Sequence, residues 1–324
     1  MKNTRFIGLA AATALTVAIV APVAAQSPSP SAMAKDPGAA AGKTLIVNMK
    51  GPGGGNPFWA AVQAGAEAMG KAYGVTVNVM SPPAESDVQS QISQIEDAIQ
   101  QGVAGIALAP TDPAALAPAV DEAIAAGIKV VFIDTKGSNE GVTFIGTDNQ
   151  VGAALAAKYM CDNVAAGGKV AILQGIITQS TGQARDEGAK AGFAACGLNL
   201  VAEVPGEWDT AKAQAATEDV LAGNPDLAGI FGSNDNMALG AVEAARAQNL
   251  LDQLTIVGFD ANPNAAAAIL AGDMEATVAQ APMNIGGFGV ESLIKLINGQ
   301  TLDPVIDTGT VLVTKDNAAD YAAK

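Results

Sequence analysis

The sequence contains no histidine, few aromatic residues and only two cysteines. Without histidine, the chain lacks the commonest general base, the Ser-His and Cys-His nucleophile pairs and the ligand of most zinc sites. Basic residues are also scarce, because 17 lysines and arginines stand against 32 aspartates and glutamates, and the net charge is −15. Such an acidic chain repels phosphate backbones, so we expect no nucleic-acid partner.

The first 25 residues have the pattern of a secretory signal. Lys2 and Arg5 precede an apolar run over residues 6–20, and small residues at the −3 and −1 positions predict cleavage after Ala25. A membrane helix is the alternative, but this run is shorter than the roughly 20 residues that span a bilayer. Cleavage removes two positive charges and moves the net charge from −15 to −17. We expect an exported protein, located in the periplasm or the cell-surface space.

The rest of the chain divides into a leader and two similar series of elements. Residues 26–42 are rich in Pro, Ser and Ala and predict a disordered leader. From Lys43 onward, strand-like and helix-like segments alternate, which requires crossover helices and parallel sheets covered on both faces. The first series is complete by about Gly146, and a second series follows it. We predict an α/β fold of two doubly wound, Rossmann-like lobes joined by a multi-strand hinge.

The predicted lobes exchange segments near the C-terminus. The N-terminal lobe is expected to combine residues 43–147 and 281–308, and the C-terminal lobe residues 148–280 and 309–324. The expected helices cover residues 57–73, 87–101, 113–126, 149–163, 184–195, 210–222, 237–248, 263–271 and 283–298. The expected strands cover residues 44–49, 75–80, 104–109, 129–133, 169–173, 198–204, 227–231, 254–259, 276–279 and 310–313.

Aromatic, carboxylate and amide side chains gather where expected strands end. In open α/β sheets, ligands bind beside the carboxyl ends of the strands. Aromatic rings cover the apolar faces of a sugar, while carboxylates and amides satisfy its hydroxyls, so this composition predicts a site for one uncharged, hydroxyl-rich ring. The candidates are Asn56, Phe58, Trp59, Asp134, Trp208, Asn234 and Asp260.

Structural roles compete with these binding roles. One ring of the Phe58-Trp59 pair is expected to belong to the core, because the first turn of a helix also packs on its sheet. Asp134 and Asp260 could instead be turn or cap carboxylates. The helix after Asn234 could be capped by Asp235 or Asn236, which leaves Asn234 as the ligand candidate.

Cys161 and Cys196 each stand near the end of a predicted helix. An even number of cysteines in an exported protein suggests a bridge, so we predict a disulfide between them. The alternative is two buried thiols that pack as small hydrophobes.

Nine short motifs follow one another between residues 56 and 280. They are Asn56-Pro57-Phe58-Trp59, Gly105-Ile106-Ala107-Leu108, Pro110-Thr111-Asp112, Val130-Val131-Phe132-Ile133-Asp134, Gly146-Thr147-Asp148-Asn149, Trp208-Asp209-Thr210-Ala211, Asn234-Asp235-Asn236-Met237-Ala238-Leu239-Gly240-Ala241, Val257-Gly258-Phe259-Asp260 and Val278-Ala279-Gln280. With these motifs in this order, the chain from about Lys43 onward resembles the ribose- and galactose-type periplasmic sugar-binding proteins, which are receptors of ABC importers. The resemblance implies the type I periplasmic binding protein fold.

The resemblance implies a function and a set of ligand residues. It implies a monomeric receptor, not an enzyme, that closes around one monosaccharide or sugar alcohol and delivers it to an ABC-transporter permease. By position, the ligand residues that it implies are Asn56, Phe58, Trp59, Asp134, Arg185, Trp208, Asn234, Asp260 and Gln280. Arg185 could alternatively be a solvated helix residue. Hinge strands are expected near Thr147, Gln280 and Thr308.

Two departures from the family pattern limit what can be carried over. Ribose-binding members have an arginine directly after the first carboxylate, where this chain has Thr135, which we include among the candidate ligand residues. The calcium-binding loop of galactose-binding members has no acidic counterpart between Ala165 and Lys169. We therefore expect no metal and no other cofactor, and neither ribose nor glucose specificity is carried over.

Three other functions remain as alternatives. A receptor of the same fold could bind a non-sugar molecule such as an autoinducer furanone. An exported glycosidase could use Asp134 and Asp260 as paired carboxylates. A transcription regulator of this fold would need a helix-turn-helix at the N-terminus, where the signal segment stands.

Overall fold

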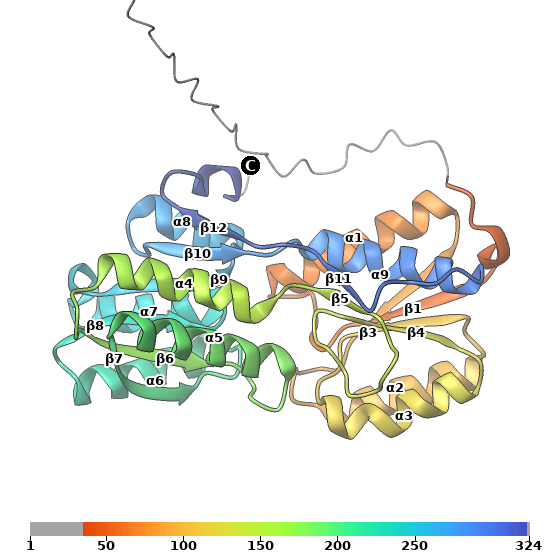
Figure 1. The fold of residues 1–324 in the computed structure, drawn as a ribbon, viewed down its shortest axis with the longest axis horizontal. Helices are drawn as coiled ribbons and strands as arrows, with labels where there is room; N and C mark the ends of the chain where they lie inside the picture. The colour runs from red at the N-terminus through yellow and green to blue at the C-terminus, as the bar shows by residue number, and fades with distance from the viewer. Residues whose placement is uncertain (1–34, 323–324) are drawn as a thin grey trace, which may run out of the picture. The chain divides into compact units, whose positions relative to one another are not determined.

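The computed structural model of the chain describes residues 35–322. The expected signal segment, its cleavage point after Ala25 and the leader up to residue 34 lie outside the described residues. Among the helices of residues 35–322, none is long and apolar enough to cross a membrane. The described part contains two six-stranded sheets with helices on both faces, as the predicted fold class requires (Figure 1).

The first sheet is entirely parallel and has the strand order β11-β5-β4-β3-β1-β2. Helices α1 (Pro57–Tyr73) and α9 (Pro282–Ile297) pack on one face, and α2 (Val88–Gln101) and α3 (Pro113–Ala125) on the other (Figure 1). Strands buried on both faces need continuous apolar runs, which the sequence supplies. We call this sheet and its helices the first lobe. Its strands are β1 (Thr44–Asn48), β2 (Thr76–Met80), β3 (Gly105–Leu108), β4 (Lys129–Ile133), β5 (Phe144–Gly146) and β11 (Val305–Asp307).

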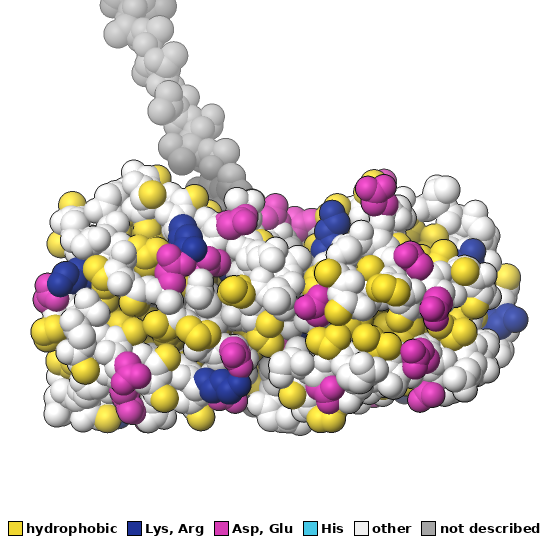
Figure 2. All heavy atoms as spheres, turned by 90° about the horizontal axis from the view of Figure 1, so that it is seen from below, with side chains coloured by type: hydrophobic (Ala, Val, Ile, Leu, Met, Phe, Trp, Pro, Cys, Tyr) yellow, Lys and Arg dark blue, Asp and Glu magenta, His cyan; other side chains and the backbone are white. Residues whose placement is uncertain are grey.

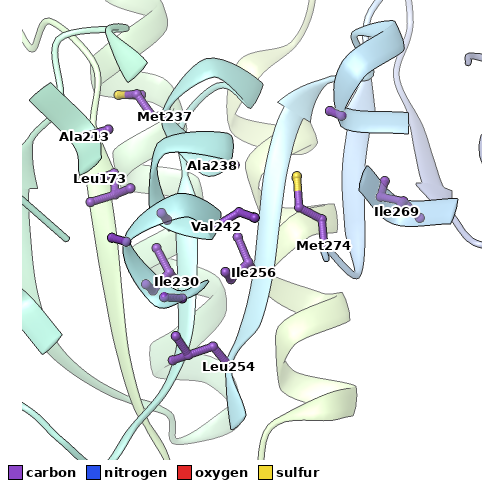
Figure 3. Packing of buried hydrophobic residues seen from close by; sticks show 14 of the residues in the cluster. Leu173, Ala213, Ile230, Met237, Ala238, Val242, Leu254, Ile256, Ile269 and Met274 are labelled. Atoms are coloured by element: carbon purple, nitrogen blue, oxygen red, sulfur yellow. The ribbon is translucent and has the colours of Figure 1, made fainter. Parts of the chain in front are cut away.

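The second sheet has the order β12-β10-β9-β8-β6-β7, and with its helices it forms the second lobe. Strand β12 runs antiparallel to β10, and the other pairs are parallel. Figure 3 shows part of its core, where Ala238 and Val242 of α7 lie beside Ile230 and Ile256 of the central strands. The strands are β6 (Lys169–Gln174), β7 (Asn199–Pro205), β8 (Leu227–Gly232), β9 (Thr255–Asp260), β10 (Ala276–Ala279) and β12 (Val311–Thr314). The helices are α4 (Asn149–Asn163), α5 (Ser180–Cys196), α6 (Thr210–Gly223), α7 (Asp235–Ala247) and α8 (Pro263–Ala271).

Two short strands at the edge of the first sheet were not predicted from the sequence. Strands β5 and β11 have three residues each and pair with one another in parallel, Val305 opposite Phe144. A run of three residues is too short to show an alternating pattern, and the pairing joins segments about 160 positions apart. Only the tertiary arrangement identifies them as strands.

Three helices begin earlier than predicted: α9 by one residue, at Pro282, and α5 and α7 by more. Helix α5 begins at Ser180 rather than Ala184, and Ser180 Oγ accepts a hydrogen bond from the N–H of Lys136 at 2.9 Å, a tertiary contact that the local sequence does not indicate. Helix α7 begins at Asp235, and its N-cap is Asn234, whose side chain accepts a hydrogen bond from Met237 N at 2.9 Å. The prediction of Asp235 or Asn236 as this cap was therefore wrong.

The described part of the leader, residues 35–42, is ordered, contrary to prediction. It contains a 3-10 turn over Gly38–Ala40. The N–H of Ala39 donates to Asn298 Oδ1 at 2.6 Å, and Lys35 N donates to Ala72 O at 2.9 Å. These partners lie at the ends of α9 and α1, so the local composition could not indicate the contacts.

The three predicted hinge positions lie beside one another where the chain passes between the sheets. Thr147 follows β5, and its hydroxyl donates to Gln280 Oε1 after β10 at 2.6 Å. Thr308, between β11 and β12, donates its N–H to Gly146 O at 2.9 Å. Their role as a hinge, and the exact lobe boundaries, stay predictions.

Helices α1 and α9 approach so closely that glycine is required at their contact. A Cβ atom added to Gly286 would lie 2.0 Å from Val62 O, and one added to Gly65 would lie 2.0 Å from Met283 O. These neighbours are backbone atoms, which can move only if the whole helix moves. The two helices cover the face of the sheet next to the binding residues, so their spacing positions the first turn of α1.

We expect Gly286→Ala to lower the free energy of unfolding by about 1–3 kcal/mol or more, the usual cost of overpacking. Urea unfolding at equilibrium measures it. Gly223→Ala at the end of α6 is the matched control, because a Cβ there meets nothing within 4 Å and Ala is the better helix former. Equal stabilities of Gly286→Ala and the wild type would contradict the required glycine contact.

Candidate ligand-binding site

A small cavity lies where the carboxyl ends of strands from both sheets meet. This is the edge at which open α/β sheets bind ligands. Nine of the ten predicted ligand residues line it. The full lining is Lys50, Asn56, Phe58, Trp59, Glu85, Asp134, Thr181, Arg185, Trp208, Asn234, Asp260 and Gln280.

Aromatic side chains line the cavity from both lobes. Phe58 and Trp59 stand in the first turn of α1, with ring centroids 5.0 Å apart and planes at 82°. Both are buried and also belong to the core of the first lobe, so the two roles expected to divide between them are combined. Trp208 belongs to the turn before α6, and a Cβ added to Gly175 would lie 2.0 Å from its ring. Gly175 therefore leaves the space that this indole needs.

Each indole nitrogen is fixed by one acceptor. Trp59 Nε1 donates to Glu85 Oε1 at 2.8 Å, and Trp208 Nε1 donates to Gln179 Oε1 at 2.9 Å. Buried indoles need such a partner, and the hydrogen bond also fixes the ring plane. The aromatic surfaces are thus held in place before any ligand arrives.

Three candidate residues have backbone conformations that side chains rarely adopt. Asp134, Trp208 and Asp260 have positive φ angles of 57°, 65° and 121°, and they account for three of the six such non-glycine residues in the described chain. Conformations of this kind are costly and gather at functional sites, where the surrounding structure enforces them. All three side chains line the cavity.

A lysine that was not predicted as a site residue, Lys50, links the charged groups of the first lobe. Lys50 follows β1 and is only 4% exposed. Its Nζ lies 3.2 Å from Asp134 Oδ2 and 3.8 Å from Glu85 Oε2, and it donates to Thr135 Oγ1 at 2.9 Å. Buried cations need carboxylate partners of this kind. Lys50 could have been predicted as a site residue, because it is a charged residue directly after the expected apolar strand 44–49, as Asp134 is after strand 129–133.

Glu85 and Thr181 were also missed, and Thr135 lies outside the lining. Glu85 comes from the loop between β2 and α2, and burial raises its pKa. Thr135 is fully buried behind Asp134, to which its hydroxyl donates at 2.7 Å. Thr135 thus orients the carboxylate in this structure, and its predicted ligand role remains untested.

The second lobe supplies a matching cation and carboxylate. Arg185 in α5 is buried, so it is no solvated helix residue. Its NH1 lies 3.7 Å from Asp260 Oδ1 and donates to Ser233 O at 2.7 Å, while its Nε donates to Asn149 Oδ1 at 2.8 Å. The guanidinium carbon lies 3.8 Å from the centroid of the Phe259 ring. These contacts fix the arginine at the cavity wall.

Asp260 is the carboxylate whose ionisation responds to pH near neutrality. Burial raises its pKa to about 7, an effect that the Arg185 charge and a 2.7 Å hydrogen bond from Gln280 Nε2 partly offset. Asp235 lies close by, fully buried, where it accepts hydrogen bonds from Thr277 Oγ1 and Asn262 N, both at 2.6 Å. Burial raises the pKa of Asp235 as well, and the nearby Asp260 charge raises it further. The second lobe therefore holds two carboxyls that resist simultaneous ionisation.

The two asparagines of the lining each cap a helix. Asn56 accepts a hydrogen bond from Phe58 N at 3.1 Å, and Asn234 caps α7. Each cap uses the amide oxygen. The amide N–H groups therefore point to other partners, and Asn234 Nδ2 has only a 3.4 Å contact to Trp208 O. They can donate to an acceptor in the cavity.

Two α/β lobes that enclose a small polar, aromatic-walled cavity at their strand ends define a two-lobed solute receptor. A sequence profile described as the periplasmic binding protein domain matches residues 49–301. The chain belongs to this family of periplasmic binding proteins.

Individual relatives are similar over most of their length. The D-ribose/D-allose-binding protein of Pseudomonas aeruginosa is 34% identical over 272 residues, which cover 80% of this chain and 85% of the relative. The D-allose-binding periplasmic protein of Escherichia coli is 35% identical over 249 residues, covering 74% of this chain and 80% of the relative. A solved ABC transporter solute binding protein from Agrobacterium vitis with bound D-fucose is 36% identical, with a TM-score of 0.81 and coverage of 85% and 96%.

Proposed function

We propose that this protein is an exported receptor that closes around one monosaccharide or sugar alcohol and delivers it to an ABC-transporter permease. One observation carries the proposal: each lobe contributes an aromatic side chain and a buried carboxylate to the same small cavity. Aromatic faces suit the C–H surfaces of a sugar ring, and carboxylates accept its hydroxyl hydrogens. A ligand that contacts both lobes favours their closed arrangement, because those contacts exist only there.

The named relatives support a sugar as the ligand. They include proteins named for ribose and allose, and solved structures with bound D-allose, D-fucose and D-arabinose. The residues proposed to contact the sugar are the predicted candidates together with Lys50, Glu85 and Thr181. The site thus offers both hydrogen-bond donors and acceptors.

Isothermal titration of the mature protein against a ligand panel tests the proposal. The panel contains D-ribose, D-allose, D-fucose, D-arabinose, sugar alcohols and one furanone. We expect saturable 1:1 binding of at least one monosaccharide or sugar alcohol. Folded protein that binds no sugar would contradict the proposal, and binding of the furanone alone would favour the non-sugar receptor.

The proposed partners follow from the same role. Members of this family are transport receptors rather than enzymes, so turnover of nitrophenyl glycosides is not expected. On the face shown in Figure 2, lysine and arginine side chains are scattered singly among more numerous acidic ones, which disfavours a nucleic-acid partner. We propose a monomer that docks on a membrane permease. Light scattering tests the monomer, and sugar uptake by cells lacking the receptor tests the transport role.

We expect sugar affinity to fall as the pH drops below about 7. Without a sugar hydroxyl on its carboxylate, Asp260 has a pKa of about 7 and is protonated below that pH. A sugar hydroxyl donates to the ionised carboxylate and so lowers this pKa, which means that binding below pH 7 must release a proton. The limiting loss is about tenfold per pH unit. Titrations between pH 5.5 and 8 measure the slope.

Asp260→Asn is the control for this pH dependence. The variant should bind more weakly at every pH, and the part of the slope due to Asp260 should disappear. Any slope that remains would report Glu85 or Asp235, whose pKa values are also raised. A wild-type affinity that stays constant from pH 5.5 to 8 would show that the binding carboxylate is ionised throughout.

A further inference from the structure

Gln179 lies between the two lobes and does not line the cavity. It is the last residue before α5 in the second lobe, and it is fully buried. An amide side chain has two acceptor positions and two N–H donors, and all four are used here. Because every hydrogen-bonding position of this buried side chain has a partner, its location and the orientation of its amide group are fixed.

The amide oxygen of Gln179 joins two groups that line the cavity from opposite lobes. It accepts one hydrogen bond from Lys50 Nζ and one from Trp208 Nε1, both at 2.9 Å. Lys50 follows β1 of the first lobe, whereas Trp208 belongs to the second lobe. A single oxygen atom therefore fixes a cation and an aromatic ring that face the ligand.

The amide nitrogen of Gln179 binds the first lobe alone. It donates to Glu85 O at 3.2 Å and to Thr111 O at 3.1 Å, in the loops that follow β2 and β3. Both partners are backbone carbonyls, which accept hydrogen bonds and cannot donate them. The position therefore requires an amide, because a carboxylate would place a second acceptor against these carbonyls.

The next two residues extend the contact to further parts of the first lobe. Ser180 Oγ accepts from Lys136 N at 2.9 Å and donates to Lys136 O at 3.1 Å, after β4. Thr181 Oγ1 accepts from Lys50 Nζ at 3.1 Å. Residues 179–181 thus bond to the segments that follow β1, β2, β3 and β4. Separation of the lobes would break all these bonds.

We propose that Gln179 is a positioning residue that links Lys50 of the first lobe to Trp208 of the second, and so holds the lysine in its binding geometry, only when the lobes are closed. The inference rests on the proposed function, since it concerns the capture of that ligand. In the open form, Lys50 is separated from this acceptor, whereas the indole of Trp208 belongs to the same lobe as Gln179 and keeps its hydrogen bond. Closure brings Lys50 to the amide oxygen, so Gln179 should slow release of the ligand without affecting its first encounter with the open site.

Stopped-flow tryptophan fluorescence with D-ribose, D-allose and D-fucose tests this inference. Gln179→Ala should raise the dissociation rate constant about 10- to 100-fold, since several buried hydrogen bonds are lost together, while the association rate constant changes less than about threefold. Gln248→Ala, at the exposed end of α7, is the matched control and should leave both constants unchanged. A residue that only stabilises the fold would lower the thermal midpoint without this split between the two rates.

A second measurement needs no ligand. Small-angle scattering of the ligand-free protein should give a larger radius of gyration for Gln179→Ala than for the wild type, because the closed population loses its direct lobe-to-lobe bonds. Gln179→Glu keeps the side-chain volume and replaces the alanine variant in both measurements if that variant does not fold. It should also release the ligand faster than the wild type.

The outcomes separate the two proposals. A wild type that binds none of the three sugars counts against the proposed receptor function, while the scattering comparison still tests Gln179. A wild type that binds sugar, with Gln179→Ala and Gln179→Glu releasing it at the wild-type rate, would overturn the role of Gln179. An equal radius of gyration in the ligand-free variant and wild type would also count against it.

Discussion

Replacing Asp134 with asparagine is expected to weaken sugar binding about 10²- to 10⁴-fold. The carboxylate of Asp134 is buried, its backbone has a positive φ angle, and its side chain lines the cavity with Lys50 Nζ 3.2 Å from Oδ2. An ionised carboxylate can accept two sugar hydroxyls, and each hydrogen bond to a charged group contributes about 1.5–3 kcal/mol. Asparagine keeps the volume but replaces one acceptor by an N–H group that faces the lysine.

Isothermal titration with the sugar that binds the wild type most tightly measures this loss. Asp97→Asn, at an exposed position of α2 in the same lobe, removes the same charge and should leave the affinity unchanged. Circular dichroism should show that both variants are folded. An Asp134→Asn affinity within about threefold of the wild-type value would show that this carboxylate does not bind the ligand.

Removal of the disulfide is expected to lower the free energy of unfolding of the second lobe by about 4 kcal/mol. The structure contains the predicted bond, which joins Cys161 of α4 to Cys196 of α5 across 35 positions. The chain-entropy estimate is about 3 kcal/mol for a 15-residue loop and about 4.7 kcal/mol for a 100-residue loop, and this loop lies between them. Urea unfolding of the Cys161→Ala/Cys196→Ala double variant gives the value.

A reducing agent provides the control for the disulfide. It should destabilise the wild type to the level of the double variant and should have no effect on that variant. Sugar affinity should change less than about twofold. Both cysteines lie near the C-terminal ends of α4 and α5, whereas the residues of α5 that line the cavity are near its N-terminal end. Equal unfolding midpoints in reduced and oxidised protein would contradict the expected stabilisation.

The periodic elements were predictable because each is determined by local pattern. Helices 57–73, 149–163 and 263–271 and strands 129–133 and 276–279 have the predicted bounds. Each has a clear capping, apolar or turn signal at its ends, such as Pro57 and Pro263 in the first helical turn. The three-residue strands β5 and β11 lack such signals, and they form through pairing with strands far away in the sequence or across a loop, β5 with β4 and β11, and β11 with β5.

The site was partly predictable for a similar reason. Asp134 directly follows β4 and Asp260 is the last residue of β9, and the topology brings the carboxyl ends of the parallel strands to one edge. Lys50 obeys the same rule but was overlooked, because a lysine at a strand end is more often solvated. Glu85 comes from a loop and Thr181 from the first turn of α5, and the groups that these side chains face depend on the packing of both lobes.

The sequence by itself determined the alternation of strands and helices, the acidic charge, the even pair of cysteines and most of the residues that surround the cavity. These features depend on residue type and on spacing along the chain. Only the tertiary structure decided which groups meet across the lobes: Lys50 with Asp134 and Gln179, Arg185 with Asp260, and the leader with α9. Such contacts join residues that are up to about 260 positions apart, and their energies depend on burial and distance, which no local pattern encodes.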